Sequence, residues 1–149
     1  MINNHHMRCL SSMFSWTSSI NDRLVSNILE DEAWVDRFLA TNKRRLALAY
    51  KVAVDELERH GLNFVPANAG HFITVDARAL LEKKNNGAPP TIEDERWLWK
   101  TLLDRGVYIA AGHVFHTRYP GVFRVTFTIE EEKLRKGIAI LAQVLQSTA

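Results

Sequence analysis

Residues 106–127 read GVYIAAGHVFHTRYPGVFRVTF, and this stretch is the most informative about the fold. Two apolar segments flank a glycine-containing loop, which predicts a strand, a connection and a second strand. Because strand side chains alternate between two faces, the second strand places three apolar residues together and a mixed set opposite them. We expect the apolar set to be core: Phe123, Val125 and Phe127. The mixed set is expected to line a pocket or a buried ion pair: Val122, Arg124 and Thr126.

Arg124 is the residue of the mixed face that requires an explanation. A guanidinium keeps its charge in a protein, so a strand interior tolerates it only where a carboxylate or a phosphate meets it. Its planar fork is suited to bidentate binding of a carboxylate. Two hypotheses follow from the residue alone. Arg124 binds the carboxylate of a ligand, or it pairs with an acidic residue of its own domain.

The first part of the chain has the pattern of two helices. Apolar residues at helical spacing predict one helix over about 18–29. A second begins at Asp31, a capping residue, and ends at the sequence His60-Gly61. At 1.5 Å per residue this second helix extends roughly 44 Å, which is typical of a connection between two bodies.

Two further helices are predicted by their N-terminal signals. Thr91 with Asp94 indicates the start of one helix, and Thr128 with Glu131 indicates the start of the last, in each case as a capping box. The last helix is expected to bury six apolar side chains: Ile129, Leu134, Ile138, Leu141, Ala142 and Leu145.

The remaining segments predict strands and one loop. Residues 62–65 favour a short edge strand, residues 71–75 a clear strand, and residues 83–90 a polar loop. The pattern predicts an α+β fold. We expect a small, largely antiparallel sheet of about three strands packed against helices and preceded by a long interdomain-type helix.

Composition excludes several classes of function. A net charge of +2 over 149 residues is too small to indicate nucleic-acid binding. The sequence contains no run of about 18 apolar residues, so it predicts no membrane span. Cys9 is alone, so no internal disulfide is possible, and we expect a reducing, cytoplasmic location. His113 and His116 lie three residues apart, but zinc needs a recognisable third ligand, so they are interpreted as loop histidines and no metal is expected.

At two places the sequence resembles one enzyme family. Residues 106–116 match Gly-Val-x-Ile-x-x-Gly-x-x-Phe-His, and residues 120–127 match Pro-Gly-x-Phe-Arg-Val-x-Phe. Both are similar to the carboxy-terminal part of class I/II aminotransferases, fold-type-I enzymes that use pyridoxal 5′-phosphate (PLP). The similarity is greatest to the branch of 1-aminocyclopropane-1-carboxylate synthases. It continues upstream through Asn68-Ala69-Gly70 and Ser11-Ser12, and runs from about residue 8 to about residue 145.

The resemblance implies that Arg124 holds the α-carboxylate of an amino-acid substrate. In the family, a Ser-x-x-Lys segment supplies the lysine that binds PLP covalently, and a phosphate-binding arginine follows it; this sequence contains neither pattern. We therefore expect no catalytic and no cofactor-binding residue in this chain. PLP is expected in the full-length enzyme, not bound covalently to this chain, which is expected to be inactive alone.

The resemblance also suggests how the chain is divided. Residues 1–7 are interpreted as a tag or non-native start. Residues 8–60 would be a helical segment that joins a large domain to the small domain, and residues 61–149 the small domain itself. Family membership implies a homo-oligomer, with no nucleic-acid or membrane partner.

The reaction stays open between two chemistries. Transamination is the first hypothesis, and a lyase reaction like that of 1-aminocyclopropane-1-carboxylate synthase is the second. The chain departs from that branch at His113, where serine is usual, and at Val122, where tryptophan is usual. A third hypothesis is a truncated, non-enzymatic domain that docks through the apolar stripe of the long helix.

Overall fold

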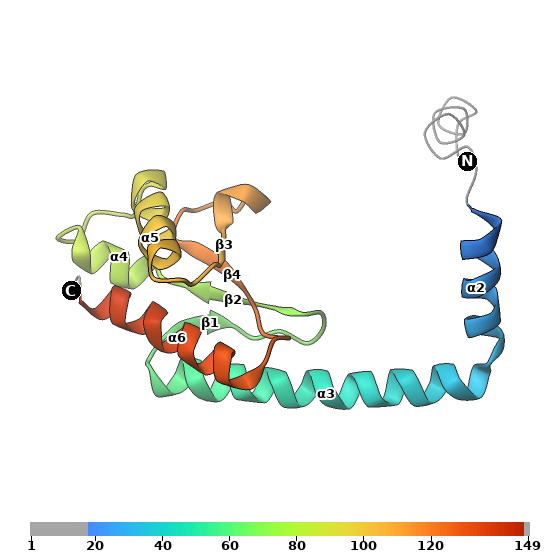
Figure 1. Cartoon of the computed structure of the whole chain (residues 1–149). Coiled ribbons are helices and arrows are strands. Elements are labelled where there is room, and N and C mark those ends of the chain that lie inside the picture. The colour runs from blue at the N-terminus through green and yellow to red at the C-terminus, as the bar shows by residue number, and fades with distance from the viewer. Residues whose placement is uncertain (1–17, 148–149) are drawn as a thin grey trace, which may run out of the picture. The chain divides into compact units, whose positions relative to one another are not determined.

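The computed structural model describes residues 18–147, which divide into two compact units with a boundary after Lys43 (Figure 1). The long helix α3 (Glu32–Arg59) crosses this boundary. The expectations for residues 1–17, including the non-native start and Cys9, lie outside the described residues.

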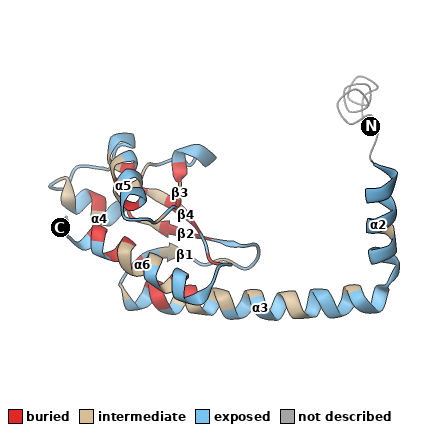
Figure 2. Ribbon diagram, in the orientation of Figure 1, coloured by how far each residue is buried: buried red, intermediate tan, exposed pale blue. Residues whose placement is uncertain are grey.

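The first unit contains α2 (Ser19–Glu30) and the beginning of α3. The predicted cap is confirmed, because Asp31 Oδ1 accepts a hydrogen bond from the Trp34 backbone N at 2.9 Å. No residue of α2 is buried, as the pale ribbon in Figure 2 shows. The apolar stripe predicted for these helices is therefore exposed; in this unit it consists of Ile20, Leu24, Val25, Ile28, Leu29, Trp34, Phe38 and Leu39.

The described part of the second unit contains an antiparallel sheet with the order β1-β2-β4-β3. Its strands are β1 (Asn63–Val65), β2 (Phe72–Asp76), β3 (Ala110–Ala111) and β4 (Val122–Thr126). The sheet thus has four strands where about three were expected. The first strand of the opening stretch is only two residues long, because a 3₁₀ turn, η1 (Gly112–Phe115), begins directly after it.

The predicted alternation along β4 and beyond it is confirmed. Phe123, Val125 and Phe127 are buried, while Arg124 is half-buried and Thr126 is exposed on the opposite face. Helices α3, α4 (Arg78–Lys84), α5 (Ile92–Asp104) and α6 (Glu131–Gln146) contribute apolar side chains to the same buried cluster. The α+β fold class is therefore confirmed. The side chain of Arg124 lies on the face of the sheet opposite this buried cluster.

Two local predictions were wrong or incomplete. No clear signal in the sequence predicted α4, whose N-cap Ala77 makes no side-chain capping bond. Thr128 does not cap the last helix, since α6 begins at Glu131 after Glu130. The Phe127 backbone N still donates a hydrogen bond to His71 O, so the chain leaves the sheet only after this residue. Ile129, which was expected in the core, is exposed.

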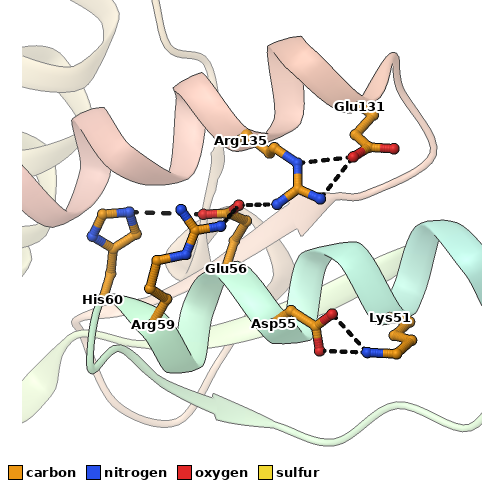
Figure 3. Close-up of polar contacts among 7 residues, drawn as sticks. All are labelled: Lys51, Asp55, Glu56, Arg59, His60, Glu131 and Arg135. Carbon is orange, nitrogen blue, oxygen red and sulfur yellow. Dashed lines mark hydrogen bonds and ion pairs between the residues drawn. The ribbon is translucent and has the colours of Figure 1, made fainter.

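A buried carboxylate joins α3 to α6. Glu56 has a side chain that is 2% exposed, and it accepts hydrogen bonds from Arg59 and Arg135 (Figure 3). His60 Nε2 lies 3.8 Å from its other oxygen. Arg135 also donates to Glu131 at 2.7 Å. A buried charge is tolerated when it is paired in this way, so the cluster fixes the end of α3 against the last helix.

The capping box at the start of α5 is confirmed. The Asp94 backbone N donates to Thr91 Oγ1 at 3.2 Å, and Asp94 Oδ2 accepts from the Thr91 backbone N at 2.8 Å. Burial acts to raise the pKa of Asp94, but the hydrogen bonds from Thr91 and Asn85 outweigh it, so the pKa lies below its ordinary value.

We expect Asp94→Ala to lower the free energy of unfolding by about 1 kcal/mol at pH 7. The pKa of Asp94 is lower in the folded protein than in the unfolded chain, where it is about 3.9. The carboxylate therefore stabilises the fold at pH values above about 3.9, and this stabilisation is lost as the pH falls through the folded-state pKa. Urea unfolding at pH 7 and at pH 2.5 measures the difference. Glu93→Ala, in the same turn but outside the box, is the control. An Asp94→Ala penalty that persists unchanged at pH 2.5 would contradict the assignment to the ionised carboxylate.

Candidate functional site

Arg124 lies at the middle of β4, an inner strand of the sheet. Its Cα is paired with Thr74 of β2 on one side and with Ala110 of β3 on the other. The alternation of β4 turns its side chain away from the buried face that Phe123 and Val125 occupy. A central strand with neighbours on both sides is a rigid support for a ligand-binding side chain.

Two aromatic rings flank the guanidinium. Its Cζ lies 4.1 Å from the ring centroid of Phe72 and 3.6 Å from that of Phe115. Phe72 comes from β2, two residues along from the partner of Arg124, which is the diagonal neighbour on the same face. Phe115 comes from η1. A cation–π contact does not use the N–H groups of a guanidinium, which can still donate hydrogen bonds to an acceptor.

No acidic residue meets this guanidinium in the described chain. Arg124 makes no ion pair within 4.0 Å among residues 18–147, and its Nε is buried with no hydrogen-bond partner. A buried, unsatisfied charged donor is costly and calls for an explanation. Of the two sequence hypotheses for Arg124, the internal ion pair is thus not observed within the described residues.

Arg124 lines a cavity of about 580 Å³ between α5, the β3–η1 segment and β4. This volume is in the range of small-molecule sites. Aromatic walls are provided by Trp99, Tyr108 and Phe115. The other basic residues along it are Arg96, Lys100 and His113, and no aspartate or glutamate belongs to its described lining. The cavity is therefore apolar in its walls and positive in its charge.

Glu95 joins α5 to two segments beside this cavity, and the sequence analysis did not single it out. Its side chain is 0% exposed. Oε1 accepts from the His113 backbone N at 3.0 Å and lies 2.6 Å from His113 Nδ1, while Oε2 accepts from the Gly121 backbone N at 2.7 Å. An acid in register with Leu98 and Leu102 on the apolar stripe of α5 was the signal available in the sequence.

The connection around Gly112 is packed too tightly for a side chain. A Cβ at this position would lie 2.6 Å from the Val122 carbonyl oxygen. Glycine therefore permits the close approach of η1 to β4 that brings Phe115 over Arg124.

The two loop histidines have different surroundings in the structure. His113 is bound to Glu95, and His116 ends η1 in the left-handed conformation, with φ of 54°. Among the described residues no group of three histidine, cysteine or acidic side chains is placed to hold a metal ion. Within the same residues no helix is long and apolar enough to cross a membrane.

The family model for aminotransferase class I and II matches residues 3–141 of the chain. The chain belongs to this family. The resemblance found in the sequence is thereby confirmed. The structure is also similar to LysN, an α-aminoadipate aminotransferase from Thermus thermophilus, with a TM-score of 0.74 at 15% identity, over 95% of this chain and 34% of that one. An aromatic aminotransferase from Pyrococcus horikoshii gives 0.63 at 18% identity, over 81% and 29%. These identities show the shared fold.

Similar curated proteins are named as 1-aminocyclopropane-1-carboxylate synthases or as synthase-like proteins. A 1-aminocyclopropane-1-carboxylate synthase-like protein 1 of Mus musculus is 33% identical over 147 residues, which is 97% of this chain and 28% of the relative. The 1-aminocyclopropane-1-carboxylate synthase of Vigna radiata is 35% identical over 117 residues, 78% of this chain and 30% of the relative. This aminotransferase-family chain thus spans less than a third of the length of either.

Lys100 is the only lysine in the described lining of the cavity, and its Nζ is paired with Asp104 at 2.9 Å. The free guanidinium of Arg124 fits a carboxylate, whereas covalent attachment of PLP requires a lysine amine that is free to react.

Proposed function

We propose that the chain is the C-terminal small domain of a PLP-dependent enzyme that acts on amino acids, with Arg124 as the residue that binds the substrate α-carboxylate. One observation carries this proposal: an arginine whose buried Nε has no partner and whose guanidinium contacts two aromatic rings at the wall of a cavity. In this proposal residues 8–60 join a large domain to the small domain of residues 61–149.

The geometry favours a carboxylate over other anions. The contacts with Phe72 and Phe115 restrict the movement of the Arg124 side chain, so two N–H···O bonds to a ligand cost less side-chain entropy. A carboxylate presents its two oxygens in the same plane. The absence of acids from the described lining removes competition for the guanidinium.

Transamination is the first candidate reaction, and cyclopropane-forming lyase chemistry is the second. The second is favoured by the names of the Mus musculus and Vigna radiata relatives. One carboxylate-binding arginine serves both reactions. In an enzyme that carries this chain, transamination converts one molecule of an added 2-oxo acid to its amino acid for each amino-acid substrate consumed. Consumption of the amino-acid substrate without conversion of the 2-oxo acid identifies the lyase.

The test of the binding role uses the chain itself. Propionate is titrated into ¹⁵N-labelled protein while the arginine Nε–H signals are followed by NMR. We expect a saturable shift of the Arg124 signal, because its Nε is buried beside the cavity and has no partner. Arg118, which lies over the Tyr119 ring and outside the cavity lining, serves as internal control. Equal, unsaturable shifts of both signals would contradict the proposal.

We also propose that this chain does not bind PLP covalently. After incubation with a low concentration of PLP and reduction by borohydride, intact mass is expected to show no site-specific stoichiometric adduct. The reason is that the sequence has no Ser-x-x-Lys segment, and Lys100, the lysine of the described cavity lining, is an exposed side chain on the surface of α5. A single lysine labelled cleanly would overturn this expectation.

We further propose that the chain self-associates as a homo-oligomer. The exposed apolar side chains of α2 and the start of α3 form the kind of surface that drives association. Light scattering at micromolar concentration is expected to give dimers or larger species, and Leu24→Glu with Ile28→Glu is expected to shift them toward monomer. Ile92→Glu, at an exposed apolar position in the second unit, is the matched control. A clean monomer of the parent chain would count against association.

A further inference from the structure

The residue next to Arg124 on β3 has a very small side chain. Ala110 is the Cα partner of Arg124, and the two partners of an antiparallel pair direct their side chains to the same face of the sheet. Both residues line the cavity between α5, the β3–η1 segment and β4. A methyl group fills little of the space beside the guanidinium, so the cavity extends from Arg124 toward α5.

The wall beyond Ala110 is aromatic. Trp99 of α5 and Tyr108, two residues before Ala110, lie edge to face with their ring centroids 6.5 Å apart, and both line the cavity. Tyr108 is 72% exposed and Val114, another residue of the lining, is 61% exposed. A ligand that fills the cavity would remove these apolar surfaces from water, which is favourable.

The two basic residues that α5 contributes to the lining leave this wall apolar. Arg96 and Lys100 are both exposed, and Lys100 is paired with Asp104 at 2.9 Å. Long basic side chains keep their charged ends in water while their methylene groups lie against apolar surface. Arg124, whose Nε is buried without a partner, is therefore the cation that receives the charged end of a ligand.

We propose that this cavity is a subsite for a large apolar or aromatic side chain. Arg124 takes the carboxylate, the ligand passes over Ala110, and its side chain packs against Trp99 and Tyr108. The ligand class is then amino acids or 2-oxo acids with a bulky apolar or aromatic side chain. This inference rests on the proposed carboxylate role of Arg124 and adds the residues that determine side-chain specificity.

The experiment compares propionate with 3-phenylpropionate, two monocarboxylates that differ only by a phenyl ring. The full chain is titrated with each at constant ionic strength, while the Arg124 Nε–H and the Trp99 indole N–H are followed by NMR. We expect 3-phenylpropionate to bind about tenfold more tightly, which is less than complete burial of a phenyl group would give, because the wall is partly open to water. The Trp99 signal is expected to move with 3-phenylpropionate and to stay in place with propionate. Trp97, outside the described lining, is the internal control.

Two variants test the position of the subsite. Ala110→Leu fills the space beside Arg124, and Tyr108→Ala removes part of the aromatic wall. Each is expected to reduce the ratio of the two affinities at least about threefold. Ala47→Leu adds the same volume at an exposed position of α3 and is expected to leave the ratio unchanged. If Ala110→Leu does not fold, Tyr108→Ala, a change at an exposed side chain, still decides the question together with the Trp99 signal of the parent chain.

A neutral analogue tests whether both ends of the ligand bind together. 3-Phenylpropan-1-ol keeps the ring but has no carboxylate, and it is expected to bind at least about fivefold more weakly than 3-phenylpropionate. Equal affinities would show that the carboxylate contributes nothing to binding, and would overturn the inference.

The possible failures are distinguishable. If both acids shift Arg124 saturably with affinities within about a factor of two, the apolar subsite is wrong and the carboxylate role of Arg124 stands. The subsite is equally wrong if the tenfold ratio survives in both the Ala110 and the Tyr108 variants. If neither acid produces a saturable shift of Arg124, both the inference and the proposed role are overturned.

Discussion

Substitution of Arg124 by lysine is expected to lower kcat/KM roughly 30- to 1000-fold in an enzyme that carries this chain as its small domain. Lysine keeps the charge but loses the bidentate fork. Loss of a charge-assisted pair in a desolvated pocket costs on the order of 2–4 kcal/mol, which corresponds to that range. In the isolated chain, the same substitution is expected to abolish saturable propionate binding.

Folding is expected to change little in Arg124→Lys, because no internal ion pair of Arg124 exists among the described residues for the substitution to break. A lysine ammonium also retains a cation–π contact with Phe72 and Phe115. Thermal unfolding of the variant, beside the control Arg118→Lys, checks this. A kcat/KM within about threefold of the parent, with a marked loss of stability, would show that Arg124 supports the sheet and does not bind substrate.

Replacement of Glu95 by leucine is expected to destabilise the second unit by about 3–5 kcal/mol. Leucine is compatible with the apolar stripe of α5, but it accepts no hydrogen bond. The backbone N–H groups of His113 and Gly121 would be left without the acceptor that they now share. Urea unfolding measures the loss, and Glu93→Leu, exposed on the same helix, is the control.

Glu95→Leu is expected to disturb the positions of η1 and β4 at the cavity more than it disturbs the helix α5 itself. Glu95 connects α5 to residues 18 and 26 positions later in the chain. One of these is at the start of η1, which carries Phe115, and the other directly precedes β4, which carries Arg124. In molecules that still fold, the NMR signal of His113 Nδ1 is expected to change, because its contact with Glu95 Oε1 at 2.6 Å is lost. An unchanged Nδ1 signal and a stability loss below about 1 kcal/mol would contradict this role.

Local features of the chain were predictable because their causes are local. The alternation that buries Phe123 and Val125 and turns Arg124 away follows from strand geometry alone. The capping box of Thr91 with Asp94 spans three residues and needs no tertiary partner. The family signature around Arg124 was readable for the same reason, since its motif is contiguous.

Where local signals were weak or had competitors, prediction failed. The helix α4 has no capping side chain, and its existence depends on packing against the rest of the core through Leu81. Thr128 with Glu131 has the spacing of a capping box, yet the hydrogen bond from Phe127 to His71 holds the chain in the sheet too long for Thr128 to begin a helix. A tertiary contact overrides the local preference in both cases.

The α+β class, the two faces of β4 and the position of Arg124 on the face opposite the core all followed from the order of residues along the chain. The groups that stand around that arginine became known only from the packing of the folded chain. Phe72 and Phe115 meet it from segments far apart in the chain, and no described acid does so. The pairing of Glu95 with His113 likewise joins residues 18 positions apart. Such contacts depend on how helices and strands pack in space, and no periodicity or short motif encodes that arrangement.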